Sequence, residues 1–348
     1  MPEPPDLSPR PFHFTGSTRD YFRIWIVNLL LSIVTLGIYS AWAKVRRLRY
    51  FYGHTSVDGS TFAYHASPLA ILKGRLIAYS VLIVLGLLGQ VAPLVASVLY
   101  LPLLMIMPIV LVRAFRFRAV NSSYRGIRFG FDGLEADAYR VFLFWPLTVA
   151  FTLGLTYPLV TKLQREFFVG GSRHGQSPFA LSVATGDVYR IYVLAAVAGL
   201  SWLGLIGLML VGAVGAGGGP DSVPNPAPGP RVLLAGALVY VGLGLLLVGV
   251  RTAFENLVWN HTTIDAHRFE SRLRTGRMFL LYVTNLAGLA LTLGLAVPWA
   301  RVRLARYRAE SLLLVPGGPL LSTSQLGDAA EAAAGAELTD AMDLDFGL

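Results

Sequence analysis

The sequence of 348 residues contains no cysteine. This absence excludes disulfide frameworks, cysteine-ligated zinc, iron–sulfur clusters and thiol nucleophiles. Charged residues are also scarce, at 14%, whereas 54% of the residues are hydrophobic. One soluble core of this length rarely accommodates so much apolar mass. The composition therefore argues against a simple water-soluble enzyme and favours a membrane protein.

Sequence patterns of catalysis and metal binding are missing as well. No His-Glu-x-x-His, Gly-x-Ser-x-Gly, Walker A or Gly-x-Gly-x-x-Gly pattern occurs. The sequence thus shows no motif of a zinc-dependent hydrolase, a serine hydrolase or a nucleotide-binding protein. From the residues alone we expect no enzyme activity, no metal and no cofactor.

The net charge of +9 is unevenly distributed. From Val315 to the C-terminus there are six acidic residues and no lysine or arginine, and this acidic, alanine-rich composition predicts disorder. Elsewhere the arginines cluster beside apolar runs, as contact with lipid headgroups and the positive-inside rule predict. We therefore expect the phospholipid bilayer, with its anionic headgroups, as the partner, and no nucleic acid. Homo-oligomerisation stays open.

Long apolar runs dominate the chain. A helix of 18 residues rises about 27 Å, close to the roughly 30 Å of a bilayer's hydrocarbon core. The predicted fold class is an all-α, polytopic helical membrane protein with internal repeats and about seven apolar segments. These segments are residues 22–42, 76–90, 91–112, 141–160, 188–214, 232–250 and 278–299.

Three of the seven runs, 22–42, 141–160 and 278–299, have basic residues at both ends and share a central Thr-Leu-Gly. Under the positive-inside rule both ends belong on the cytoplasmic side, so each run would turn at its Thr-Leu-Gly. The chain would then form four full spans plus three re-entrant hairpins. The alternative is a straight span that violates the rule at one end, and length alone suits this alternative.

Internal repeats organise the chain. Asn28, Thr35-Leu36-Gly37 and Trp42-Ala43 recur 257 residues later as Asn285, Thr292-Leu293-Gly294 and Trp299-Ala300. Such self-similarity is typical of membrane transporters. The prediction is a repeat-built transmembrane domain over residues 12–315, with repeat blocks near 12–65, 129–181 and 269–310 and a Gly/Pro loop at 215–230. Disordered segments are expected at 1–11 and 316–348.

Polar side chains within apolar runs form the first candidate site. Asn28 and Thr35, like Asn285 and Thr292, lie seven residues apart and so on one helical face. An unsatisfied amide in hydrocarbon costs several kcal/mol, so these groups need partners. Two interpretations are open for these polar groups. In the first they line a pore or substrate path, and in the second they make interhelical hydrogen bonds that only hold the bundle together.

A second candidate set would contact headgroups or small anions. Basic residues follow Trp42 and Trp299, and a His-Thr-x-x-Asp element occurs at His54 and again at His261. Arginine and histidine donate hydrogen bonds to phosphate, although the same residues serve as ordinary helix anchors and turn formers. The set comprises Lys44, Arg46, Arg49, His54, Asp58, His261, Arg301, Arg303 and Arg306.

Three segments of the chain resemble the YjgN-like family of uncharacterised bacterial inner-membrane proteins. They are the run from Tyr21 to His65, LVWNHTTIDAHRF and LYVTNLAGLALTLGLAVPWARVRLARYRAE. The likeness covers roughly residues 12–314. The Gly/Pro insertion and the acidic tail depart from the family pattern. The resemblance implies a polytopic, multi-pass protein of the bacterial inner membrane. It implies no activity and transfers no catalytic residue.

Two functional hypotheses follow. The first is permease-like or channel-like transport of a small or amphipathic solute, motivated by the duplication and by the paired Asn and Thr faces. The second is a non-transporting lipid-binding or membrane assembly scaffold, motivated by the arginine-rich helix ends.

Overall fold

The computed structural model describes residues 7–215 and 230–317. The Gly/Pro loop expected at 215–230 and the acidic tail expected at 316–348 fall outside the described residues, apart from their first or last one or two positions. Residues 1–6 of the expected N-terminal tail also lie outside, whereas Arg10–Pro11 forms a strand, β1.

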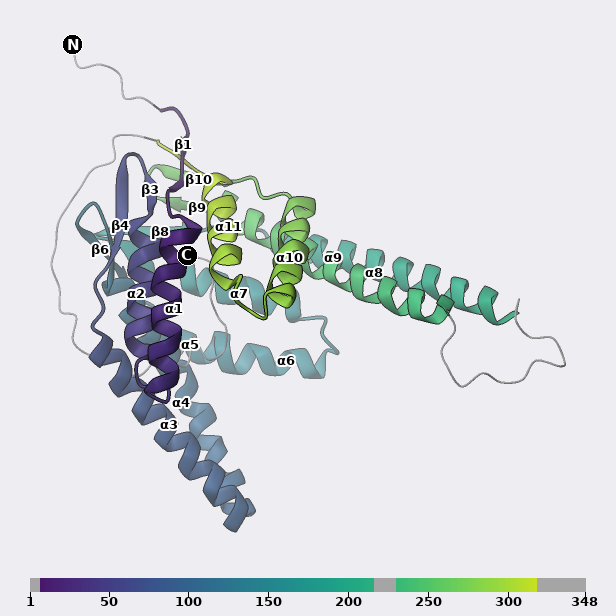
Figure 1. The fold of residues 1–348 in the computed structure, drawn as a ribbon, viewed down its shortest axis with the longest axis horizontal. Helices are drawn as coiled ribbons and strands as arrows, with labels where there is room; N and C mark the ends of the chain where they lie inside the picture. Colours follow the sequence, from purple (N-terminus) through teal and green to yellow (C-terminus); the bar gives the residue numbers. More distant parts are fainter. Residues whose placement is uncertain (1–6, 216–229, 318–348) are drawn as a thin grey trace.

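Pairs of helices alternate along the chain with β-hairpins (Figure 1). Each pair links the last strand of one hairpin to the first strand of the next. All five pairs therefore leave the sheet at the same rim, opposite the strand turns. The pairs are α1 (Thr18–Val34) with α2 (Ser40–Gly53), α3 (Pro68–Val91) with α4 (Pro93–Val120), the series α5 (Glu135–Tyr139), η1 (Arg140–Phe144), α6 (Trp145–Phe151) with α7 (Tyr157–Gly170), α8 (Thr185–Gly215) with α9 (Pro230–Asn260), and α10 (Thr275–Leu291) with α11 (Val297–Glu310).

The hairpins assemble into one antiparallel sheet of eleven strands, in the order β1-β11-β10-β9-β8-β7-β6-β5-β4-β3-β2. The two outermost strands, β1 and β2, belong to one extended segment, and Phe12 between them donates its backbone N–H to the Leu312 carbonyl at 3.0 Å. The sheet thereby closes into a barrel. The remaining strands are β2 (His13–Phe14), β3 (Thr55–Val57), β4 (Ser60–Tyr64), β5 (Ser122–Tyr124), β6 (Ile127–Phe131), β7 (Ser172–His174), β8 (Ser177–Leu181), β9 (Thr262–Ile264), β10 (His267–Ser271) and β11 (Leu312–Val315).

The expectation of an all-α fold is thus wrong, because the protein combines a barrel-like sheet with its helices. Turn chemistry explains the strands. Asp58-Gly59 and Arg125-Gly126 have positive φ at both positions, 48° and 69° in the first turn and 51° and 77° in the second. Two-residue turns of this kind match the twist of antiparallel strands. Strands this short are stable only because closure leaves no open edge.

A ring of aromatic side chains fills the barrel. Neighbouring rings stack, with centroids 6.2 to 6.4 Å apart. Because one ring comes from nearly every hairpin, the sequence repeat is also the packing repeat of the core, and burial of these rings drives closure. The ring consists of Phe12, Phe62, Phe129, Phe179 and Phe269.

The three Thr-Leu-Gly segments are turns between helices, so the straight-span alternative is wrong. Helix α1 ends at Val34 and α2 begins at Ser40, and the same break separates α6 from α7 and α10 from α11. At 17 residues, α1 is about 25 Å long, which is shorter than the bilayer core. We call these pairs the short hairpins.

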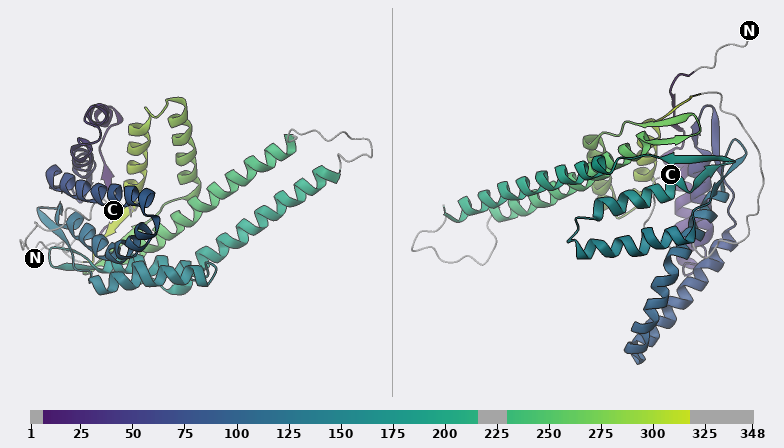
Figure 2. Two further views of the ribbon diagram at one scale, coloured as in Figure 1. Left: turned by 90° about the horizontal axis from the view of Figure 1, so that it is seen from below. Right: turned by 180° about the vertical axis from the view of Figure 1, so that it is seen from behind.

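Four helices in the described part of the chain are long and apolar enough to span a membrane. They form two pairs, α3 with α4 and α8 with α9, which point away from the barrel in different directions (Figure 2). Only 6% of the apolar window of α8 and of α9 is buried within the protein. Their side chains thus face outward, as helices solvated by lipid do.

Candidate functional site: the short hairpins and the helical rim

Two of the predicted polar residues hold the short hairpins together. In the first hairpin, the buried Asn28 on α1 accepts a hydrogen bond at its Oδ1 from Arg46 Nη1 on α2, at 3.4 Å. In the last hairpin, the buried Asn285 on α10 accepts from Arg303 Nη1 on α11, at 3.3 Å. Both pairs are separated by 18 residues across the turn. Each amide therefore bonds within its own hairpin, to a guanidinium from the facing helix.

The two predicted threonines stabilise the turns. Thr35 Oγ1 donates to the Leu31 carbonyl at 2.7 Å and accepts from the Tyr39 backbone N–H at 2.9 Å. Thr292 Oγ1 makes the equivalent bonds to Gly288, at 2.6 Å, and from Ala296, at 2.9 Å. These bonds satisfy backbone groups left open where the first helix ends. The local contacts account for both threonines without a shared polar path.

The tips of the short hairpins carry leucines that sequence reasoning did not select. Leu36, Leu153 and Leu293 are 94%, 94% and 95% exposed, and each has a φ of 50°. A leucine in this left-handed region is rare, because its Cβ crowds the following carbonyl. The protein thus has three solvent-exposed leucines on strained turns. The repeated Thr-Leu-Gly is the sequence pattern that could have identified them.

Several predicted basic residues fix the helices to the barrel. Arg49 Nη2 donates to the Ala66 carbonyl at 3.4 Å, and Arg306 Nη2 donates to the Gly16 carbonyl at 3.0 Å. Both arginines lie four residues before the end of their helix. Arg116 and Asn256, which the sequence analysis missed, occupy the same position in α4 and α9 and contact the Phe131 and Leu273 carbonyls. These rim contacts repeat around the barrel.

The other predicted cations lie within the helical layer. Lys44 is buried, with 8% of the residue exposed. Arg301 Nη1 donates to the Tyr21 hydroxyl at 3.3 Å, which joins the first and last short hairpins. Arg303 also covers the Trp299 ring, with its Cζ 4.5 Å from the ring centroid. A guanidinium over an indole is attracted by the ring quadrupole.

The His-Thr-x-x-Asp element divides between the two rims of the barrel. His54 Nδ1 lies 2.7 Å from the Tyr50 carbonyl, and His261 Nδ1 lies 2.8 Å from the Leu257 carbonyl. Both histidines therefore cap helix ends at the helical rim. Asp58 lies instead in a strand turn at the opposite rim. Because the His and Asp residues are on opposite rims, they do not form one anion site.

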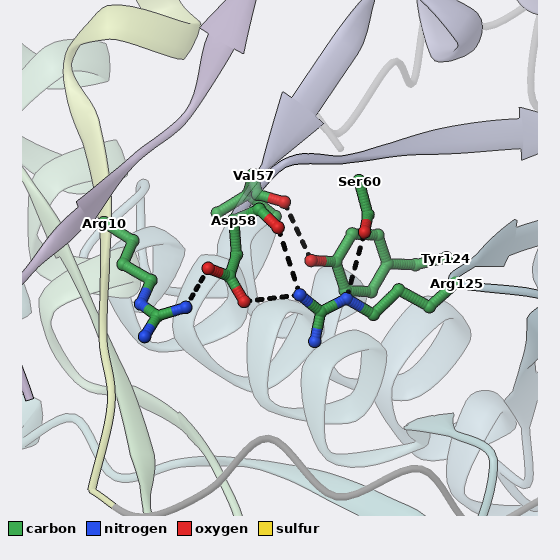
Figure 3. Close-up of polar contacts among 6 residues, drawn as sticks. All are labelled: Arg10, Val57, Asp58, Ser60, Tyr124 and Arg125. Carbon is green, nitrogen blue, oxygen red and sulfur yellow. Dashed lines mark hydrogen bonds and ion pairs between the residues drawn. The ribbon is translucent and has the colours of Figure 1, made fainter. Parts of the chain in front are cut away.

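Asp58 is the centre of a polar network at that opposite rim (Figure 3). Its carboxylate forms ion pairs with Arg10 and Arg125, neither of which the sequence analysis selected. Arg125 also donates to the Asp58 carbonyl at 3.0 Å and to Ser60 Oγ at 3.1 Å. The Tyr124 hydroxyl donates to the Val57 carbonyl at 2.9 Å, and burial raises the pKa of Tyr124. This network ties β1 to two hairpins at the closure of the barrel.

Four apolar spans, apolar hairpin tips and arginine-bearing helices at one rim define a multi-pass membrane protein with a β-barrel domain. A family described as "Bacterial protein of unknown function (DUF898)" matches residues 9–341, and the chain belongs to this family.

The relatives agree on location. The chain is 31% identical to the inner membrane protein YjgN of Escherichia coli strain K12 and of Escherichia coli O157:H7, over 159 residues that cover 45% of this chain and 40% of each relative. It is 26% identical to the inner membrane protein YjgN of Salmonella typhimurium strain LT2, over 86% of both chains. The matches to the Escherichia coli proteins thus span less than half of their length. No solved structure matches the chain. The protein is a multi-pass protein of the bacterial inner membrane, as the sequence resemblance predicts.

Proposed function

We propose that the protein is a non-transporting, lipid-binding scaffold that carries a β-barrel at the surface of the inner membrane. The exposure of Leu36, Leu153 and Leu293 at the hairpin tips is the observation that carries this proposal. A fully exposed leucine on a strained turn gains nothing in water, whereas lipid tails would bury it. The proposed position of the three tips is therefore inside the cytoplasmic leaflet.

The depth of the hairpins fits one leaflet. Asn28 lies seven residues before Thr35, and its partner Arg46 lies seven residues after Tyr39. Seven residues of helix rise about 10 Å, which is the depth to which interfacial helices insert. The Arg46 guanidinium would then lie at the level of the phosphates when the tip is immersed. Arg303 has the equivalent place in the last hairpin.

Anionic headgroups are the proposed ligands at this level. A cation near an anionic membrane surface contributes about 1 kcal/mol to binding. The two helices α2 and α11 each carry four basic residues. Several weak contacts of this kind would select acidic phospholipids without a specific pocket.

Permease-like or channel-like transport of a small or amphipathic solute is the competing proposal. Its support is the internal duplication. The amides and threonines that motivated a polar path are satisfied by local hydrogen bonds within each hairpin. The two spanning pairs also point apart rather than enclosing a space (Figure 2). We therefore favour the scaffold.

Depth measurements test the immersion of the tips. The chain has no cysteine, so the variants Leu36→Cys, Leu153→Cys and Leu293→Cys each accept a single environment-sensitive NBD label. In nanodiscs we expect blue-shifted emission that brominated lipids quench. Arg268→Cys, on an exposed position of β10, is the control and should report water. Tip labels that iodide quenches and brominated lipids do not would contradict the proposal.

Reconstitution separates the two functions. Native mass spectrometry of the full chain should detect more retained phosphatidylglycerol than phosphatidylcholine. The double variant Arg46→Gln, Arg303→Gln should reduce this preference, whereas Arg268→Gln should not. Proteoliposomes should show no potassium or carboxyfluorescein flux above empty vesicles. A flux that Asn28→Leu or Asn285→Leu abolishes in a folded protein would favour transport instead.

A further inference from the structure

The described chain ends at the rim of the barrel opposite the helices, which we call the strand-turn rim. Strand β11 starts beside the end of α11 at the helical rim and runs to this rim. There Pro316 is buried, and the Gly317 backbone N–H donates to His267 Nδ1 at 3.2 Å. A Cβ on Gly317 would collide with the Ala266 carbonyl of the β9–β10 turn. The chain is thus held against this turn up to its last described residue.

The phenylalanine ring of the barrel is well covered only next to β11. Phe269 on β10 and Phe12 beside β1 are buried, and β10 and β1 are the two neighbours of β11. Phe62, Phe129 and Phe179, on strands farther from β11, are partly exposed. All five side chains point into the barrel and the helices leave it at the other rim, so the exposed aromatic area faces the strand-turn rim. Cover of the ring therefore ends where the described chain ends.

The next residues have the composition and the reach to cover these rings. Gly317-Gly318-Pro319 is typical of a turn, and Leu320 and Leu321 follow it. Four residues of extended chain span about 14 Å, and β8 lies three strands from β11, at about 4.8 Å per strand. Leu321 can therefore reach Phe179 on β8. Contact between leucine and aromatic side chains is favourable because it removes apolar surface from water.

Charge favours the same contact. The residues after Gly317 include six acids and no lysine or arginine. Because the net charge of the chain is +9, the rest of the chain carries +15. The field of a protein sums over all its charges, so this attraction requires no unpaired arginine. Arg10 and Arg125 keep their ion pairs with Asp58 at the strand-turn rim.

We propose that residues 318–348, which we call the C-terminal segment, fold back over the strand-turn rim and cap the barrel. Leu320 and Leu321 lie against the partly exposed Phe129 and Phe179, and the acids face the basic body of the chain. The cap is a contact within one chain, and it competes with any partner that would bind the exposed rings. It does not depend on the scaffold function, because the strand-turn rim is the rim away from the hairpin tips.

Disulfide cross-linking of the full chain tests the cap. The chain has no cysteine, so the double variant Ser177→Cys, Ser322→Cys carries one thiol at the strand-turn rim and one just after Leu321. Ser177 is on the inward side of β8, two residues before Phe179. The matched control is Ala180→Cys, Ser322→Cys, because Ala180 is exposed on the outer side of the same strand. A disulfide forms only when the two Cα atoms come within about 7 Å.

The measurement is the rate of intramolecular disulfide formation under mild oxidation in an uncharged maltoside detergent. The Ser177 pair should react at least about tenfold faster than the Ala180 pair, since even partial burial of two leucines favours the capped state by that factor. Adding Leu320→Ser and Leu321→Ser should bring the Ser177 pair down to the rate of the Ala180 pair. A salt concentration of about 1 M should slow both pairs but preserve the preference, because salt screens charges and not apolar contacts.

Equal rates for the two pairs would overturn the cap, as would a preference that survives the replacement of both leucines. A preference that salt abolishes would show that charge alone holds the segment, which also contradicts the proposal. Disulfides between two chains, seen as dimers on a non-reducing gel, would assign the C-terminal segment to the barrel of a second copy and overturn a contact within one chain. Thermal unfolding of the reduced variants checks that the barrel is intact in every pair.

Discussion

Replacement of the tip leucines by glycine gives effects of opposite sign in water and in lipid. A leucine in the left-handed region costs about 1–2 kcal/mol, and glycine removes this strain at a cost of roughly 0.5–1 kcal/mol in chain entropy. In water, Leu36→Gly should therefore stabilise the protein by up to about 1 kcal/mol. The side chain is 94% exposed, so the protein itself contributes almost no burial that could be lost.

In a bilayer the balance reverses. Burial of a leucine side chain in an apolar medium is worth about 1.5–3 kcal/mol, which exceeds the relief of strain. Leu36→Gly should then lower the free energy of unfolding by about 1–2 kcal/mol, and Leu153→Gly and Leu293→Gly should do likewise. Leu36→Met is the matched control, because it keeps an apolar side chain on the same strained turn.

The assay is denaturant unfolding of the full chain in nanodiscs, followed by tryptophan fluorescence. Trp25 and Trp42 lie in the first short hairpin and report its opening. A Leu36→Gly variant that is more stable than the wild type in nanodiscs would refute the immersion of the tip. Equal destabilisation by Leu36→Met and Leu36→Gly would also refute it, since the loss would then not depend on apolar burial.

Three further predictions concern the barrel and the hairpins. Phe129→Ala removes one partly buried ring from the stack and should cost less stability than the about 3–5 kcal/mol of a fully buried phenylalanine, measured by barrel unfolding, while Arg268→Ala should cost little. Asn285→Leu leaves the Arg303 guanidinium short of an acceptor and should cost about 1–3 kcal/mol, seen as faster proteolysis of the last hairpin. Burial lowers the pKa of His174 below its ordinary 6.5, so the stability that the neutral imidazole contributes is fully present above pH 6.5 and is lost as the pH falls from 6.5 to the lower pKa of the folded state. His174→Leu should flatten the fall in stability between pH 7.5 and 5, measured by thermal unfolding, and an unchanged slope would contradict this.

The sequence predicted the helices well because their signals are local, but it left open whether the Thr-Leu-Gly segments turn or span. Apolar runs of 15 residues or more and a repeated Thr-Leu-Gly need only neighbouring residues to be recognised. The barrel was missed because its strands are two to five residues long and lie between strong helical signals. Asp58-Gly59 is a local turn signal, and the alternating Phe62 and Tyr64 are typical of an extended segment. Nothing local indicated that four such hairpins would pair with one another and with the strands β1, β2 and β11 from the two ends of the described chain.

The sequence identified the candidate polar residues but not the hydrogen-bond partners of their side chains. Seven-residue spacing predicted that Asn28 and Thr35 lie on one side of a helix, but Thr35 is the residue that follows the end of α1. The partner of Asn28 is Arg46, on the facing helix of the same hairpin, and that pairing depends on where the turn falls. Likewise, Glu255 on α9 pairs with Arg308 on α11, 53 residues further along the chain, and no pattern in the sequence joins the two.

The circular order of the barrel bears directly on transport. Strand order follows chain order, so the five helical pairs follow one another around the rim as short, long, short, long, short. Because five is an odd number, two short hairpins must be neighbours in the ring. These are the first and last short hairpins, which the hydrogen bond between Arg301 and Tyr21 joins. One short hairpin therefore separates the two spanning pairs on one side, and two separate them on the other. This separation supports the proposed scaffold function over a transport path lined by the spanning helices of one chain.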